Sequence, residues 1–297
     1  MNKSIIKKTD VKNSLKSKNP INLCIKLNSL FKLPVHPFNL SNNGEKTYQE
    51  WQYEKGIDTL QFYLKHTTID KMFKNKKVLD IGCGAGGKTI FYASKGVESI
   101  VGLEILNKYK KDAINLAEKH SVSQKFTFVC SDAAKTPFSD KSFDTIIMND
   151  AMEHVDNPEN VLEECYRLLK KDGKLYLNFP PYNHPYGAHL SDSIAIPWVH
   201  LFFSEKTLIT TYKELVKDLP DGKDRIEFRI SERIDKTEYF SYINKMTIKR
   251  FNNILKNSKF DIEYYKEEPL RHMFKYVSKL PLVKEYLVKM VVCVLTK

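Results

Sequence analysis

Five short apolar runs, each followed by glycine or polar residues, recur through the middle of the chain. They occupy residues 77–81, 100–105, 126–130, 143–148 and 174–179. Runs of this length that are apolar almost throughout are typical of strands buried on both faces of a parallel sheet. Longer segments with helical spacing separate them. The alternation predicts an α/β fold in which helices cover both faces of a mostly parallel sheet.

The N-terminal part of the chain has a different character. Residues 1–19 are polar and rich in lysine, and we expect disorder there. Residues 21–31 carry apolar side chains at helical spacing, which indicates a short amphipathic helix that either packs on the protein or touches a lipid surface. A loop is expected over residues 33–45, and a helical pattern then starts at Thr47 and continues to the first strand.

The first strand runs into a glycine-rich turn and then into a helix that begins near Lys88. Four glycines, at positions 82, 84, 86 and 87, lie within six residues. Glycine permits the positive φ angles of a tight turn and lets a ligand come close to the backbone. Amide groups at the start of the helix point toward such a ligand. Gly82, Gly84 and Gly87 also satisfy the G-x-G-x-x-G pattern, so a nicotinamide enzyme is an alternative at this stage.

Each of the next three strands also ends in polar residues. Glu104 closes the second strand, 22 residues after Gly82, where a carboxylate can accept hydrogen bonds from the two hydroxyls of a ribose. Ser131-Asp132-Ala133 follows the third strand, and Asn149-Asp150 follows the fourth. Because the carboxyl ends of parallel strands share one edge of a sheet, these groups should lie together there.

With these motifs in this order, the chain resembles the class I S-adenosylmethionine-dependent methyltransferases. The closest resemblance is to the branch of methyltransferase type 11, which is related to the ubiquinone and menaquinone methyltransferases, and it covers residues 51–182 and 246–297. It implies S-adenosylmethionine as the cofactor, with Asp80 and the glycine loop at its methionine part, Glu104 at its ribose and Asp132 at its adenine amine. The residues implied to bind the cofactor are Asp80, Gly82, Cys83, Gly84, Gly86, Glu104, Ile105, Ser131, Asp132, Ala133, Asn149 and Asp150.

The resemblance also implies a seven-stranded, Rossmann-like sheet with an antiparallel last strand. Residues 260–265 and 288–295 fit its sixth and seventh strands, and an antiparallel seventh strand is not expected in a nicotinamide dehydrogenase. We expect the chain to divide into a basic, partly disordered N-terminal extension (1–45), a cofactor-binding core whose first helices form a lid (46–180), a substrate-covering insertion after the fifth strand (181–245) and the C-terminal part of the core sheet (246–297).

The insertion is rich in aromatic residues and histidines, and it begins at the sheet edge where ligands bind. This favours a pocket for a partly apolar acceptor, although the aromatics explain an ordinary small core equally well. A hydroxyl acceptor benefits from a general base, and histidine titrates in the useful range. His154, after the fourth strand, is the first catalytic candidate, with a structural role in that turn as its alternative. His189 and His200 of the insertion are the reserves, and their spacing does not indicate a metal site.

The net charge of +12 does not by itself indicate nucleic-acid binding. Residues 1–32 hold eight lysines and one acid, so the remaining residues carry only +5. Six of the 48 basic residues are arginine, the side chain best suited to bidentate phosphate contacts. The run from Asn178 to Tyr182 resembles an adenine-methyltransferase motif, but it follows the fifth strand rather than the fourth. We therefore expect no nucleic-acid partner.

Cysteine usage and hydropathy suggest a location. The five cysteines are scattered without the spacing of a disulfide framework or a metal site. No apolar run approaches the ~20 residues of a membrane helix, and the basic N-terminus lacks the apolar core of a signal peptide. We expect a cytoplasmic protein without a transmembrane segment, for which peripheral contact with a membrane stays open.

Together these patterns predict an S-adenosylmethionine-dependent methyltransferase acting on a small, partly apolar molecule, with O-methylation ahead of N- or C-methylation. Two other functions stay open. One is methylation of RNA or protein, with the basic tail supplying attraction. The other is a non-catalytic S-adenosylmethionine-binding protein, against which the intact Asp80, glycine loop, Glu104 and Asp132 argue. The sequence does not identify the acceptor, the methylated atom or the oligomeric state.

Overall fold

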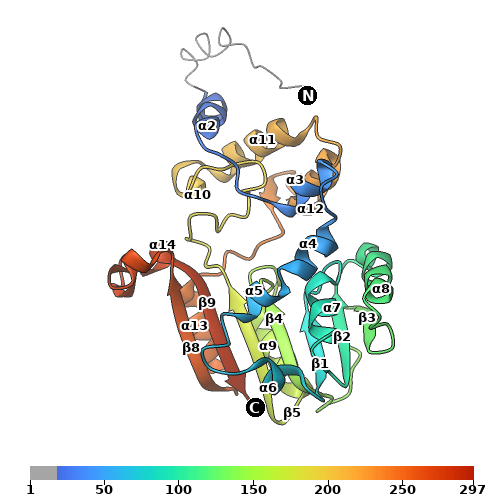
Figure 1. Cartoon of the computed structure of the whole chain (residues 1–297). Coiled ribbons are helices and arrows are strands. Elements are labelled where there is room, and N and C mark those ends of the chain that lie inside the picture. The colour runs from blue at the N-terminus through green and yellow to red at the C-terminus, as the bar shows by residue number, and fades with distance from the viewer. Residues whose placement is uncertain (1–18) are drawn as a thin grey trace. The chain divides into compact units, whose positions relative to one another are not determined.

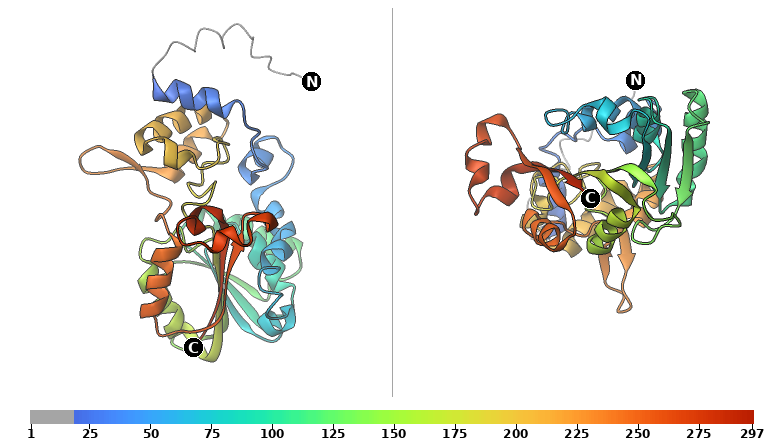
Figure 2. Two further views of the ribbon diagram at one scale, coloured as in Figure 1. Left: turned by 90° about the vertical axis from the view of Figure 1, so that its left-hand side faces the viewer. Right: turned by 90° about the horizontal axis from the view of Figure 1, so that it is seen from below.

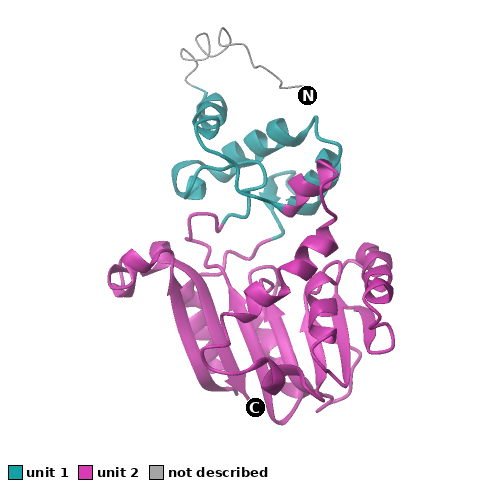
Figure 3. Cartoon of the chain, in the orientation of Figure 1, with its two compact units in different colours: residues 1–36, 188–242 teal, residues 37–187, 243–297 magenta. Residues whose placement is uncertain are grey.

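The structure, a computed structural model, describes residues 19–297. Its contacts divide them into two compact units (Figure 3). The first unit joins residues 19–36 to residues 188–242, and the second joins residues 37–187 to residues 243–297. The disorder expected for residues 1–19 falls, apart from Asn19, outside the described residues. Asn19 itself caps the first described helix.

The second unit is built on a seven-stranded sheet (Figure 1). Its strands are β1 (Lys77–Ile81), β2 (Ser99–Glu104), β3 (Phe126–Cys130), β4 (Phe143–Asn149), β5 (Leu169–Phe179), β8 (Asp261–Pro269) and β9 (Val288–Thr296). Their order in the sheet is β3-β2-β1-β4-β5-β9-β8. Neighbours from β3 to β5 pair in parallel, whereas β9 runs antiparallel to both β5 and β8. The predicted Rossmann-like sheet with an antiparallel last strand is confirmed.

Alternate side chains of the strands enter two separate cores, one on each face of this sheet. Leu79 and Ile81 of β1 belong to one core, and Val78 belongs to the other. This follows from the strand geometry, which points successive side chains to opposite faces. Burial on both faces is the reason why the strands are apolar almost throughout.

Helices cover both cores (Figure 2). The core that contains Leu79 is covered by α9 (Pro158–Leu168) and α13 (Ile248–Asn257). The core that contains Val78 is covered by α5 (Gly56–Leu60), α6 (Ile69–Phe73), α7 (Gly87–Ala93) and α8 (Lys110–Lys119). The connections β1–β2, β2–β3 and β4–β5 run through such helices, whereas β3 and β4 are joined by a loop over residues 131–142.

The region before β1 is less regular than its pattern predicts. The helical pattern from Thr47 is divided into α4 (Tyr48–Glu54), α5 and α6. The loop expected over residues 33–45 contains the short helix α3 (Pro37–Asn42). Helix α4 begins with a capping box formed by Thr47 and Glu50. Glu50 also accepts a 2.6 Å hydrogen bond from Lys119 of α8, which fixes α4 to the helical layer.

A long connection joins β8 to β9. It contains the short helices η3 (His272–Phe274), η4 (Val277–Lys279) and α14 (Lys284–Leu287). The amide of Leu270 donates a 2.7 Å hydrogen bond to the carbonyl of Leu287, which closes the connection at its base. We call residues 270–287 the β8–β9 knob.

The first unit combines α2 (Pro20–Asn28) with the segment 188–242. This segment contains α10 (Val199–Phe202), α11 (Glu205–Val216), α12 (Gly222–Arg229) and a hairpin of β6 (Ile230–Glu232) and β7 (Glu238–Phe240). Helix α2 packs on α11. Asn28 at its end donates to the carbonyl of Ser193 (2.8 Å) and accepts from the amide of Ala195 (2.7 Å). The short helix predicted over residues 21–31 is thus part of a folded unit.

Two findings bear on the expected environment. Each of the five cysteines, all of which lie in the described part of the chain, is free. Over residues 19–297, none of the helices combines the length and the apolar character needed to cross a bilayer.

Candidate cofactor and active site

Four loops that follow neighbouring strands meet at one edge of the sheet in the second unit. Strands β3, β2, β1 and β4 are adjacent and parallel, so their carboxyl ends share this edge. Across it, in order, lie Asp132, Glu104, the glycine turn and Asn149-Asp150. The chain moves from β1 outward to β2 and β3 and then crosses back from β3 to β4, on the other side of β1. Such a switch point is where open α/β sheets bind ligands.

The turn after β1 requires glycine at three positions. The φ angles of Gly82, Gly84 and Gly86 are +75°, +53° and +80°, in the left-handed region that side chains disfavour. A Cβ on Gly82 would lie 2.8 Å from Cβ of Ala151, and a Cβ on Gly86 would lie 2.8 Å from Cβ of Ala113. The glycines therefore serve both the curvature of the turn and its close packing on the neighbouring loop and helix.

Hydrogen bonds within the protein fix the shape of this turn. The amides of Gly82 and Cys83 donate to the carbonyl of Leu103 at 2.9 and 3.1 Å, and the amide of Gly86 donates to the carbonyl of Cys83 at 2.9 Å. Cys83 itself is buried. The surroundings of Gly84 are more open, because the nearest atom to a Cβ there would be a ring carbon of Tyr48 at 3.7 Å.

Glu104 binds the glycine turn from the end of β2. Its Oε2 accepts a 3.0 Å hydrogen bond from the amide of Gly84, and its Oε1 accepts a 3.0 Å bond from the amide of Leu106. Each carboxylate oxygen offers two lone pairs, so each keeps capacity for a ligand hydroxyl. Ile105, the next residue, is 66% exposed and gives this edge an apolar surface beside the carboxylate.

Asp80 lies buried beneath the turn. Its Oδ2 accepts a 2.5 Å hydrogen bond from the hydroxyl of Thr89, in the first turn of α7. Burial raises the pKa of Asp80 to about 7, against the lowering effects of the Thr89 hydrogen bond and the charge of Lys88. The side chain thus ties the end of β1 to the start of α7. Direct contact of Asp80 with the cofactor stays a prediction.

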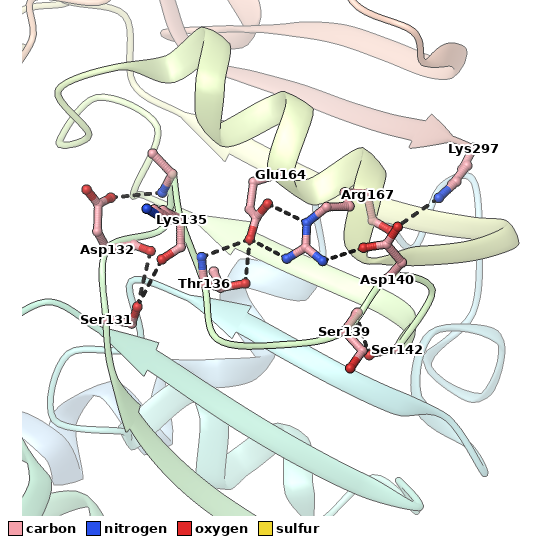
Figure 4. A network of polar contacts seen from close by, with 11 residues as sticks. Ser131, Asp132, Lys135, Thr136, Ser139, Asp140, Ser142, Glu164, Arg167 and Lys297 are labelled. Carbon is pink, nitrogen blue, oxygen red and sulfur yellow. Dashed lines mark hydrogen bonds and ion pairs between the residues drawn. The ribbon is translucent and has the colours of Figure 1, made fainter.

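Asp132 is exposed in a loop that is anchored to α9 (Figure 4). Thr136, further along this loop, donates to Oε1 of Glu164 through both its amide (2.8 Å) and its hydroxyl (2.6 Å). Arg167 donates to both carboxylate oxygens of Glu164. Although burial opposes it, these hydrogen bonds lower the pKa of Glu164 to about 2. Nearer to β3, Ser131 Oγ lies 3.3 Å from the carbonyl of Lys135.

Asn149 belongs to a buried polar network. Its Oδ1 accepts from the hydroxyl of Tyr63 (2.6 Å) and from Nδ2 of Asn178 (2.7 Å). Its Nδ2 donates to the hydroxyl of Tyr92 at 3.1 Å. The side chain therefore joins β4 to β5 and α7, and a contact of Asn149 with the cofactor stays a prediction. The sequence pattern did not identify Tyr63, Tyr92 and Asn178 as partners, because they meet only across the sheet.

The turn after β4 contains a cluster of ionisable groups. Asp150, with φ of +52°, pairs with Lys88 of α7 at 2.7 Å. Glu153 is buried, and burial together with the charge of Asp150 raises its pKa well above the usual value. His154 is partly exposed, and its Nε2 lies 3.8 Å from Oε1 of Glu153. The turn thus places an imidazole next to a carboxyl group that holds its proton more firmly than an exposed glutamate.

Asn244 holds this turn in place. Its Nδ2 donates to the carbonyls of Met152 (2.8 Å) and Val155 (2.7 Å), and its amide donates to the carbonyl of Glu153 (2.8 Å). The three bonds fix the backbone on both sides of His154. Sequence reasoning missed Asn244, because no local pattern relates it to a turn about ninety residues earlier in the chain.

Helix α4 lies directly over the glycine turn. A Cβ on Gly87 would lie 2.5 Å from Cβ of Gln52, so the two helices are in close contact at this point. The hydroxyl of Tyr48 accepts a 2.8 Å hydrogen bond from Nε2 of Gln52. Burial and then the charges of Glu104 and Asp150 raise the pKa of Tyr48. The position is that of the predicted N-terminal lid.

The predicted site residues are distributed over both units. The twelve predicted cofactor residues, including Ser131 and Ala133 of the loop after β3, all belong to the second unit, as does His154. His189 and His200 belong to the first unit, where His200 lies in α10. The second unit therefore contains the complete predicted cofactor set with one of the three predicted histidines.

A family model matches the part of the chain that holds this site. Residues 79–177 match the model described as a methyltransferase domain. The matched segment begins in β1 and ends in β5, and so it contains the glycine turn, Glu104, Asp132 and His154.

Named relatives and solved structures share parts of the chain. It is similar to a chloroplastic tocopherol O-methyltransferase of Arabidopsis thaliana, with 28% identity over 144 residues, which are 48% of this chain and 40% of that protein. It is similar to a sterol 24-C-methyltransferase of Gibberella zeae, with 35% identity over 122 residues, 41% of this chain and 31% of that protein. The chain thus spans less than half of the length of these relatives.

A solved structure extends the likeness in fold. The crystal structure of a putative sarcosine dimethylglycine methyltransferase from Galdieria sulphuraria has a TM-score of 0.54 and 16% identity to this chain. The likeness covers 88% of this chain and 97% of that one. At this identity it shows that the fold is shared.

Proposed function

We propose that residues 79–177, which match a methyltransferase domain model, form a class I S-adenosylmethionine-dependent methyltransferase domain. In this proposal the protein methylates a small, partly apolar molecule, with an oxygen atom as the favoured acceptor. The observation that carries the proposal is the meeting of Glu104, the glycine turn and Asp132 at one sheet edge. A nicotinamide enzyme, the alternative raised by the glycine pattern, does not fit the antiparallel β9.

The residues at this edge fit the cofactor. Glu104 retains acceptor capacity for the ribose hydroxyls, and the exposed Ile105 offers an apolar surface for the purine. The exposed carboxylate of Asp132 suits the adenine amine. Gly84, open except for Tyr48, leaves room for the methionine part. In this proposal the close packing under Gly82 and Gly86 keeps the cradle rigid before any ligand enters.

The cofactor supplies a methyl group that is already activated by a positively charged sulfur. The protein therefore mainly positions the acceptor and excludes water. Helix α4, with Tyr48, covers the glycine turn and serves the second task in this proposal. When the acceptor is a hydroxyl, Nε2 of His154 would accept its proton while the methyl carbon exchanges its bond to sulfur for a bond to the acceptor oxygen. Asn244 holds the backbone on both sides of that histidine.

The acceptor class is proposed from the relatives and from composition. The named relatives are a tocopherol O-methyltransferase and a sterol 24-C-methyltransferase. A partly apolar acceptor agrees with the aromatic residues of segment 181–245, which we propose to cover the acceptor, with His189 and His200 as reserve bases. The segment leaves the sheet at the end of β5, on the ligand-binding edge. We also propose a cytoplasmic location, where thiols stay reduced.

Calorimetric titration with S-adenosylmethionine and with NAD tests the cofactor. We expect binding of the methyl donor and none of NAD. The reverse result would overturn the assignment. Incubation of cell extracts with a labelled methyl donor then separates the remaining alternatives: label in small molecules supports the proposal, whereas label that nuclease or protease releases indicates RNA or protein as the acceptor. Binding without any labelled product points to a non-catalytic protein.

The substitution His154→Ala tests the base. We expect turnover to fall by about 10²- to 10⁴-fold, the usual contribution of general base catalysis, with cofactor affinity unchanged. His66→Ala is the matched control, because His66 pairs with Glu263 near the start of β8, at the opposite edge of the sheet. Equal turnover in both variants would remove His154 from the mechanism.

A further inference from the structure

The β8–β9 knob has its apolar side chains on the outside. Met273 is 72% exposed, Tyr276 76% and Leu282 90%. Val277 and Leu280 are exposed as well. A part of the chain that faces only water would bury such side chains and expose polar ones.

Little of the knob is buried. Its one buried residue is Ser278, which is 5% exposed and whose hydroxyl lies 3.4 Å from the carbonyl of Lys275. Backbone hydrogen bonds hold the short helices together, for example from the amide of Lys284 to the carbonyl of Leu280 at 2.9 Å. The knob is thus a hydrogen-bonded structure that leaves several large apolar side chains exposed.

Basic residues surround these apolar side chains. The knob contains Arg271, Lys275, Lys279 and Lys284 against one acid, Glu285. Lys284 pairs with Glu267 of β8. Within the described part of the chain, no ion pair joins Arg271, Lys275 or Lys279 to a carboxylate. Glu285 accepts from the amides of Ile248 and Lys249 and is therefore already engaged.

We propose that the β8–β9 knob docks on an anionic lipid bilayer surface. Exposed apolar and tyrosine side chains enter the interfacial region of the bilayer, while lysine and arginine side chains around them bind anionic headgroups. A second copy of this chain is a poorer occupant, because an isologous contact would bring the same three cations together. Docking goes beyond methyl transfer and does not depend on it.

The sheet topology places the knob at the same edge as the predicted cofactor residues. β8 is parallel to β1–β5, so its end and the start of β9 lie at the same edge of the sheet as the cofactor residues. The knob emerges at this edge, three strand spacings or about 14 Å from β4. Figure 1 shows it beyond the ends of β8 and β9, around α14. Docking would therefore bring the ligand-binding edge toward the membrane surface.

Local tryptophan quenching in the full chain is the first test. Leu282→Trp places a reporter on the knob, and Ile234→Trp places one at a fully exposed position in the turn between β6 and β7. The vesicles contain phosphatidylcholine and phosphatidylglycerol with brominated acyl chains. We expect more fluorescence quenching in Leu282→Trp than in the parent, and no more quenching in Ile234→Trp than in the parent. The proposal is overturned if both variants show the same extra quenching, or if neither shows any. This holds even if the basic N-terminal tail attracts the protein to the vesicles.

A binding measurement is the second test. In the variant Met273→Ser/Tyr276→Ser/Leu282→Ser we expect partition into these vesicles to fall at least about tenfold, since three apolar anchors are lost. Ile234→Ser is the matched control, and circular dichroism with S-adenosylmethionine titration verifies the fold. Unchanged partition of the triple variant contradicts the proposal. A second contradicting result is a parent protein that does not bind vesicles but forms a dimer in sedimentation, if the triple variant stays a monomer. That result would indicate that the knob binds a second copy of the chain. No methyl acceptor is needed, so failure here is separate from failure of the proposed function.

Discussion

At the scale of single residues, two carboxylates hold the glycine turn and the start of α7 in place. Glu104 accepts amide hydrogen bonds from Gly84 and Leu106, and Asp80 accepts from Thr89 beneath the turn. Both carboxylates therefore organise the protein whether or not a ligand is bound. Removal of either charge should consequently affect stability and cofactor affinity together.

Glu104→Gln should weaken S-adenosylmethionine binding by roughly 10- to 150-fold, because a hydrogen bond to a charged group contributes about 1.5–3 kcal/mol. The glutamine keeps the size of the side chain but loses the charge. Calorimetric titration measures the change. Glu98→Gln is the control. Glu98 directly precedes β2, at the end of that strand opposite to Glu104, and it pairs with Lys77 of β1. An affinity in Glu104→Gln that matches the control would show that the carboxylate does not hold the ligand.

The stability of the parent should fall relative to Asp80→Asn as pH rises. The pKa of Asp80 is about 7 in the folded protein and near 3.8 in the unfolded chain. Between these values the folded state binds more protons, so the free energy of unfolding decreases with rising pH. The full effect is at most about 4 kcal/mol, since each pKa unit corresponds to 1.36 kcal/mol.

Urea unfolding of both proteins at several pH values from 4 to 8 measures this difference. The asparagine can still accept the hydrogen bond from Thr89, so the variant should fold. A difference in stability between the two proteins that stays constant with pH would contradict the raised pKa of the Asp80 carboxyl.

At the scale of elements, the carboxyl ends of β1, β3 and β4 are held in position by contacts with helices and residues from other parts of the chain. The turn after β1 packs on α8 through Gly86 and Ala113, and the loop after β3 is bound to α9 through Thr136 and Glu164. Asn244, just before α13, fixes the turn after β4. The site is preorganised by these contacts.

Gly86→Ala should destabilise the protein by about 1–3 kcal/mol, the cost of a strained backbone conformation together with a steric conflict. The new Cβ would lie 2.8 Å from Cβ of Ala113. Gly44→Ala is the matched control, because Gly44 has φ of +66° but nothing within 4 Å of a Cβ. It reports the cost of the positive φ alone.

The comparison uses urea unfolding and S-adenosylmethionine titration of both variants. We expect the larger loss of stability and a loss of affinity in Gly86→Ala only. If the two variants lose equal stability and keep equal affinity, close packing at Gly86 does not shape the cofactor site.

At the scale of the whole molecule, the first unit has a charged interior. Asp192 pairs with Arg225 (3.0 Å) and Arg229 (3.1 Å), and all three side chains are buried. Tyr212 donates a 2.8 Å hydrogen bond to the same carboxylate. The pKa of His36, which lies near this cluster, falls to about 4 through burial. Such a cluster tolerates the loss of one partner poorly.

Asp192→Asn should destabilise the first unit by about 3–5 kcal/mol, because two buried guanidinium groups lose their shared carboxylate. Glu238→Gln is the control, since it removes a more exposed ion pair with Lys213 and should cost at most about 1 kcal/mol. Urea unfolding followed by tryptophan fluorescence is informative, because Trp198 lies in the first unit and Trp51 in the second. Equal unfolding midpoints for the two variants would contradict the structural role of Asp192.

The sequence by itself determined the sheet and the edge at which its polar loops meet. Strands buried on both faces must be apolar throughout, and the carboxyl ends of parallel strands must share an edge, so local patterns were sufficient for β1 to β5, the glycine turn and Glu104. The predicted fold and cofactor follow from these local features.

Only the tertiary structure decided which polar groups meet. Tyr63, Tyr92 and Asn178 reach Asn149 from other elements, and Asn244 reaches the turn that carries His154. The exposed apolar side chains of the β8–β9 knob were also hidden in the sequence, where they are indistinguishable from core residues. The reason is physical: the alternation of side chains reports the face of an element, whereas contacts between distant residues depend on how the faces are packed together.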